Sequence, residues 1–119
     1  MILLKELRQN ILDRGWQLLH SAMPAYELQI RKAVQRGDLV SINHRTAAFL
    51  ETYFDILFAL NRKTHPGEKR LMQFCLEQCE ILPKDFDANL NSLFAHLFSD
   101  PEAVLEDILA ILQQLSKIN

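Results

Sequence analysis

Apolar side chains recur along most of the chain at intervals of three and four residues, the spacing of one face of an α-helix. Proline or glycine interrupts this pattern at several points, which divides it into segments joined by short linkers. The pattern predicts an all-α fold, an antiparallel bundle of five to six helices. The expected helices cover residues 3–19, 25–36, 39–61, 66–81, 85–98 and 101–115.

The expected helix over residues 39–61 should form the centre of the bundle. Its last part is apolar around most of the helical cylinder, which is typical of a helix that is surrounded by others. Gly37 is suited to end the preceding helix, and Asp38 is suited to cap the first turn of this one. The residues of this helix that we expect to be buried are Tyr53, Phe54, Leu57 and Leu60.

Three of the other expected helices also have a clear apolar face. Ser99 or Asp100 can cap the last helix, and Pro101 suits its first turn because the missing N–H would have no partner there. The residues expected on the buried faces are Tyr26, Ile30, Ala33, Val34, Phe86, Leu90, Leu93, Phe94, Leu97, Val104, Leu105, Ile108, Leu112 and Leu115.

The length of 119 residues fits one domain, so we treat residues 1–119 as a single helical domain. The net charge of −2 is unevenly distributed. Residues 1–70 hold eleven Lys and Arg against seven Asp and Glu, whereas residues 71–119 hold two against eight. This balance does not suit a protein that coats DNA, but a local anion site in the basic part is compatible with it.

No apolar run is long enough to cross a bilayer or to form the core of a signal peptide, which favours a cytoplasmic protein without membrane contact. Cys75 and Cys79 lie one helical turn apart on a stripe expected to face the core. We therefore expect free, packed thiols rather than metal ligands. The four histidines are scattered, and the sequence predicts no metal site.

Glu51 and Asp55 lie four residues apart and form a polar seam on the otherwise apolar central helix. The simpler interpretation is an edge that faces solvent. In the alternative, the seam faces a cleft or a partner domain, where a partly buried carboxylate could act as a base or hold a cation.

Basic side chains gather after the central helix, where Arg62, Lys63, Lys69 and Arg70 surround a Pro-Gly break. If a helix begins at this break, its unpaired N–H groups attract anions, and Gly67 lets a ligand approach the backbone closely. This arrangement suits phosphate. The alternative is an exposed basic turn.

The stretch FALNRKTHPGEKRL, residues 58–71, resembles the signature of a helical domain at the C-terminus of nucleotidyltransferase-fold proteins. That domain is similar to the C-terminal bundles of kanamycin- and lincosamide-type nucleotidyltransferases and, more distantly, to HEPN domains. The resemblance implies that Lys69 reaches a nucleotide triphosphate across the domain cleft and that Asn61 shapes the turn or touches the ligand. With Arg62 and Gly67, these residues form the predicted phosphate- or nucleotide-binding set.

The resemblance also implies a place in a larger assembly. Nucleotidyl transfer uses Mg²⁺ held by a Gly-Ser and paired-aspartate motif, which this sequence does not contain. We therefore expect the chain to be inactive alone and to help bind nucleotide phosphates or the acceptor substrate. The Mg-nucleotide triphosphate site would be completed by a nucleotidyltransferase-fold domain in the same chain or a separate one. In this interpretation the chain is the C-terminal part of a larger nucleotidyltransferase-like protein, and a homodimer stays open.

Two other classes of function remain. One is a structural or partner-binding helical bundle without a ligand. The other is an HEPN-like ribonuclease, which uses an Arg-x₄₋₆-His motif. The nearest match runs from Arg62 to His65 and has only two residues between them, so we expect no RNA cleavage by this chain.

Overall fold

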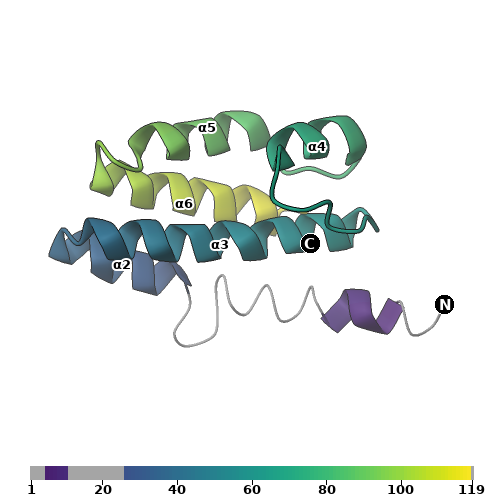
Figure 1. The fold of residues 1–119 in the computed structure, drawn as a ribbon, viewed down its shortest axis with the longest axis horizontal. Coiled ribbons are helices and arrows are strands. Elements are labelled where there is room, and N and C mark those ends of the chain that lie inside the picture. The colour runs from purple at the N-terminus through teal and green to yellow at the C-terminus, as the bar shows by residue number, and fades with distance from the viewer. Residues whose placement is uncertain (1–4, 11–25, 119) are drawn as a thin grey trace.

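A computed structural model describes residues 5–10 and 26–118 of the chain. These residues form helices and no strand, which confirms the all-α prediction (Figure 1). Residues 5–10 are a short helical segment, and the rest of the expected first helix lies outside the described residues. The longer helices are α2 (Tyr26–Arg36), α3 (Leu39–Leu60), α4 (Leu71–Gln78), α5 (Phe86–His96) and α6 (Pro101–Ser116).

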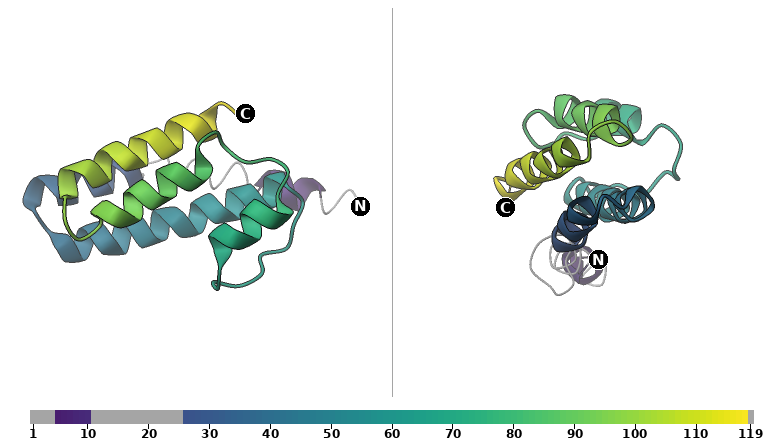
Figure 2. Two further views of the ribbon diagram at one scale, coloured as in Figure 1. Left: turned by 90° about the horizontal axis from the view of Figure 1, so that it is seen from above. Right: turned by 90° about the vertical axis from the view of Figure 1, so that its left-hand side faces the viewer.

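The helices stack in two layers. In the lower layer of Figure 1, α2 packs antiparallel to α3; in the upper layer, α5 packs antiparallel to α6. Contacts between α2 and α6 join the layers along one side (Figure 2). The α2–α3 and α5–α6 turns lie at one end of the bundle, whereas α4 lies at the other end, near the C-terminal half of α3 (Figures 1 and 2). The basic stretch after α3 therefore lies at the α4 end.

The start of α3 is fixed by local chemistry, as the sequence predicts. Gly37 has a positive φ of 64°, which ends α2, and Asp38 is the N-cap of α3. The Asp38 carboxylate accepts hydrogen bonds from the Ser41 N–H at 3.2 Å and from the Ser41 hydroxyl at 2.8 Å. Because these bonds favour the charged form, they lower the pKa of Asp38.

The core is centred on α3. Tyr53, Phe54 and Leu57 are buried as predicted, and Leu60 is partly buried against the same cluster. Phe94 differs from the prediction, because 41% of its surface is exposed on α5. The other buried core residues include Ile30, Ala33, Ile42, Phe49, Ile56, Phe58, Phe86, Leu90, Leu93, Val104, Ile108, Ile111, Leu112 and Leu115.

The two cysteines are free and buried, which confirms the prediction of packed thiols. Burial, together with the neighbouring Cys79, raises the pKa of Cys75 to about 12. The Cys75 thiol is therefore protonated at neutral pH and is a poor nucleophile.

A polar cluster joins α5 to α6. The Asp107 carboxylate accepts a 2.7 Å hydrogen bond from the Ser92 hydroxyl and lies 2.7 Å from Nδ1 of His96. Asp100 caps α6 by accepting a hydrogen bond from the Ala103 N–H, and Pro101 lies in the first turn, as predicted. The hydrogen bond to Asp107 raises the pKa of His96, because it stabilises the protonated ring.

The His96–Asp107 pair is expected to make stability depend on pH. In the folded protein the pKa of His96 lies above its ordinary value of 6.5. The stabilisation by the pair is therefore fully present below about pH 6.5 and is lost as the pH rises through the folded-state pKa of His96. The wild type should therefore melt at a higher temperature than His96→Gln, and this difference should be larger at about pH 5.5 than at about pH 8.5. Thermal circular dichroism measures this difference. The same difference at both pH values would contradict the proposed coupling.

Candidate functional site

The chain after α3 does not enter a helix at the Pro-Gly break. Helix α4 begins at Leu71, so the prediction of a helix start at residues 65–67 is wrong. Gly67 has a φ of 99°, outside the helical region, and its N–H donates to Nδ1 of His65 at 3.0 Å. Lys69 therefore lies in a loop rather than in the first helical turn, and the Gly67 N–H already has a partner.

The C-terminus of α3 closes in a Schellman motif. The Arg62 N–H donates to the Ala59 carbonyl at 3.2 Å, and the Lys63 N–H donates to the Phe58 carbonyl at 2.9 Å. Arg62 occupies the left-handed position of this motif, with a φ of 55°. Glycine is the usual residue at this position because a Cβ is unfavourable there.

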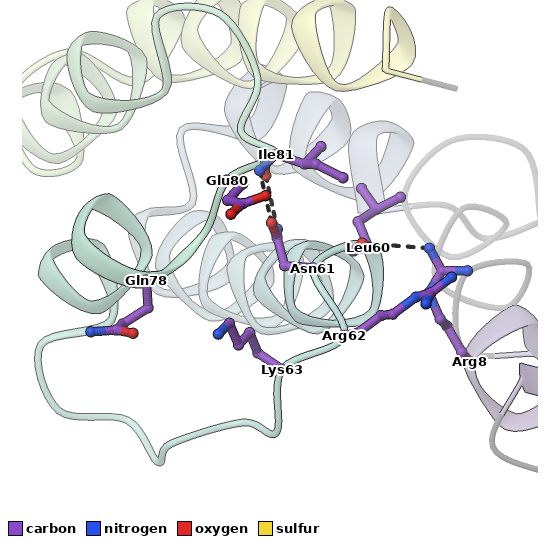
Figure 3. A pocket seen from close by; sticks show the side chains of 8 residues that line it. All are labelled: Arg8, Leu60, Asn61, Arg62, Lys63, Gln78, Glu80 and Ile81. Carbon is purple, nitrogen blue, oxygen red and sulfur yellow. Dashed lines mark hydrogen bonds between the residues drawn. The ribbon is translucent and has the colours of Figure 1, made fainter. Parts of the chain in front are cut away.

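The Asn61 side chain joins this helix end to the segment between α4 and α5. Its amide nitrogen donates to the carbonyl oxygens of Leu57 and Ile81, both at 2.8 Å. Its carbonyl oxygen accepts a hydrogen bond from the Ile81 N–H, also at 2.8 Å (Figure 3). Asn61 thus shapes the turn, which is one of the two roles predicted for it.

Arg8 reaches the same helix end from the segment 5–10. Its Nε donates to the Ala59 carbonyl at 2.6 Å. Its Nη2 donates to the Leu60 carbonyl at 3.4 Å (Figure 3). A cation is favourable here because the C-terminal end of a helix carries a partial negative charge. Arg8 has five N–H donors, so these two bonds leave donors for another acceptor.

A pocket of about 420 Å³ lies beside the end of α3 (Figure 3). We call it the basic pocket, because three of its lining side chains are cationic and one is anionic. The size falls within the range of small-molecule sites. Its lining residues are Arg8, Leu60, Asn61, Arg62, Lys63, Gln78, Glu80 and Ile81.

The structure divides the predicted phosphate-binding set. It brings Asn61 and Arg62 into the basic pocket, together with Arg8 and Lys63. Lys69 is exposed in the loop and, of the described pockets, lines neither the basic pocket nor the groove defined next. The same holds for Gly67.

A second pocket of about 770 Å³ lies on α3, and we call it the apolar groove. Its floor is formed by side chains of α3, α4 and α5, and four polar side chains stand among them. The lining residues are Ala47, Leu50, Glu51, Phe54, His65, Glu68, Arg70, Leu71, Met72 and Phe94.

The polar seam of α3 borders the apolar groove. Glu51 lines the groove, whereas Asp55 is exposed one turn further along α3. Desolvation raises the pKa of Asp55; His65 opposes this shift and Glu51 adds to it. In the described residues, no group of three or more His, Cys, Asp or Glu is placed to hold a metal ion.

Arg62 and His65, the nearest match to the ribonuclease motif, belong to different pockets. Arg62 lines the basic pocket, whereas His65 lines the apolar groove and packs edge-on against Phe58 with ring centroids 5.0 Å apart. No lining residue is shared by the two pockets. This placement does not bring Arg62 and His65 to one reacting group.

The sequence pattern does not indicate that Arg8, Glu80 or Ile81 belongs to the site, and it indicates Lys63 only as part of the basic stretch. Arg8 lies 51 residues from its partner Ala59, and Ile81 lies 20 residues from Asn61. Contacts at such separations leave no periodic signal in a single sequence. A local signal for the site is Asn61, whose amide side chain follows directly after the last turn of α3.

No protein-family model, curated protein sequence or solved structure matches this chain at a significant level. None of the helices in the described part of the chain has the length and apolar character needed to cross a bilayer.

Proposed function

We propose that this chain is a helical accessory domain that binds the phosphates of a nucleotide through the basic pocket. The supporting observation is that Arg8 of the segment 5–10 and the adjacent Arg62 and Lys63 after α3 line one cavity of about 420 Å³. Arginine binds phosphate oxygens through two parallel N–H groups, and lysine adds a mobile point charge.

The backbone of Arg62 supports this proposal. A residue other than glycine in the left-handed region costs about 1–2 kcal/mol. Arg62 nevertheless occupies this position, and its side chain lines the basic pocket. A strained residue whose side chain lies in a pocket favours a role for that side chain in binding.

The pocket alone should bind weakly. Glu80 lines the same cavity and repels an anion, and the negative end of α3 lies beside it. We therefore expect an affinity of about millimolar for the isolated chain. In the proposed assembly, a nucleotidyltransferase-fold domain supplies the Mg²⁺ ligands and most of the nucleotide contacts. The basic pocket then holds one end of the phosphate chain.

Arg62→Gly is expected to weaken binding of inorganic tripolyphosphate at least tenfold, or about 1.4 kcal/mol, without unfolding the domain. Glycine suits the left-handed position, so the free energy of unfolding should change by no more than about 1 kcal/mol. Chemical-shift titration by NMR measures the binding, and urea unfolding measures the stability.

Arg70→Gly is the matched control. Arg70 also has a positive φ, of 56°, so this change removes the same charge and the same kind of backbone strain. It lines the apolar groove rather than the basic pocket, and tripolyphosphate binding should be retained. Equal losses in both variants would indicate non-specific attraction by the loop. A loss confined to Lys69→Ala would move the phosphate site to the outer part of the loop.

A further inference from the structure

The apolar groove is a gap in one side of the bundle. Its floor includes Leu50 and Phe54 of α3, Met72 of α4 and Phe94 of α5. The layers are joined along the other side by contacts between α2 and α6. In the end-on view of Figure 2, the α3–α4 loop lies on the side of the bundle opposite α6. Residues of this loop border the apolar groove, so one more helix could pack on this side.

The shape of the groove suits a helix. Its lining residues on α3 run from Ala47 to Phe54, which is two helical turns or about 10 Å. Leu71 and Met72 follow directly after the loop, at the start of α4. An amphipathic helix of another protein can place side chains at i, i+3 or i+4, and i+7 into a groove of this length.

The exposure of Phe94 supports a missing cover over the apolar groove. It follows Leu90 by four residues on α5, and the apolar pattern predicts it in the core together with Leu90 and Leu93. Leu90 and Leu93 are fully buried, but Phe94 remains 41% exposed in the groove. The apolar face of α5 is therefore covered at Leu90 and Leu93 but not at Phe94.

The charges in the groove favour a basic partner. Glu51 and Glu68 contribute two negative charges, and Arg70 contributes one positive charge. Asp55 is not a lining residue, but it interacts electrostatically with His65 and Glu51, which are. The lining thus carries one more negative than positive side chain, which favours a basic over an acidic partner helix.

We propose that the apolar groove binds an amphipathic helix of a partner protein, with apolar side chains on the floor and Lys or Arg beside Glu51 and Glu68. This inference does not depend on the proposed phosphate site, which uses a different set of residues. Charge complementarity would set the choice of partner, and the apolar floor would supply most of the binding energy.

Two synthetic amphipathic peptides of about 18 residues test the proposal, since about five helical turns cover the groove with a margin. Both have the same Leu-rich apolar face; one has Lys and the other Glu on the polar face. Fluorescence anisotropy with the full chain should show at least tenfold tighter binding of the Lys peptide. Equal affinities, or a preference for the Glu peptide, would overturn the proposal.

Matched variants locate the binding. Phe94→Ala should weaken binding of the Lys peptide at least fivefold, whereas Phe98→Ala, at a more exposed position outside the groove, should not. Glu51→Gln should weaken it, whereas Glu102→Gln on α6 should not. Ala47→Arg fills the groove from an exposed helix position, so it provides the test if Phe94→Ala unfolds.

Other occupants give different results. A dimer detected by sedimentation equilibrium and abolished by Phe94→Ala would show that a second copy of the chain fills the groove, and this would overturn the proposal. If Phe98→Ala weakened peptide binding as much as Phe94→Ala does, the peptide would bind at the end of the bundle rather than in the apolar groove. This result would also overturn the proposal.

Discussion

Leu57→Ala is expected to lower the free energy of unfolding by about 2–5 kcal/mol. Leu57 lies in the central helix α3 and has no exposed surface. Truncation removes buried methyl groups and leaves a cavity, because the neighbouring helices cannot fully close around it. Chemical unfolding in urea, followed by circular dichroism, gives the difference between the two proteins.

The matched control is Leu76→Ala on α4. This side chain is 52% exposed, so the same change in chemistry should cost no more than about 0.5 kcal/mol. A loss below about 1 kcal/mol at Leu57, or equal losses at both positions, would mean that α3 is not the centre of the core.

Features governed by local chemistry could be predicted from the sequence. The Asp38 cap and the Gly37 stop fix the junction between α2 and α3, and Asp100 with Pro101 fixes the start of α6. Each signal acts within about one helical turn, so a single sequence contains all of it. For the same reason, the expected helix over 39–61 agrees with α3 to within one residue.

Features that depend on distant contacts could not be predicted in this way. Pro66 suits the first turn of a helix, but the backbone at Gly67 and Arg70 has positive φ, and α4 begins only after both. The exposure of Phe94 depends on how far α5 lies from α3, which the pattern of α5 alone does not contain. The basic pocket needs Arg8 and Glu80 beside Arg62, and these come from three separate parts of the chain.

Asn61→Ala is expected to lower the free energy of unfolding by about 1.5–3 kcal/mol. The Asn61 side chain makes three hydrogen bonds of 2.8 Å, one to Leu57 and two to Ile81. Each such bond contributes about 0.5–1.5 kcal/mol, and the partial exposure of this site favours the lower half of the sum. The loss should be measured by urea unfolding, as for the core variant.

Asn61→Asp separates this hydrogen-bonding role from simple filling of space. The aspartate keeps the shape and still accepts from the Ile81 N–H, but its second oxygen faces the carbonyl oxygens of Leu57 and Ile81. At neutral pH it should therefore destabilise the fold at least as much as alanine does. Repulsion of the carboxylate raises its pKa in the folded state, so the penalty should shrink as the pH falls toward about 4 and the acid is protonated. If the aspartate variant is as stable as the wild type at neutral pH, the side chain does not join α3 to the segment before α5. The turn that places Arg62 and Lys63 at the basic pocket would then need another support.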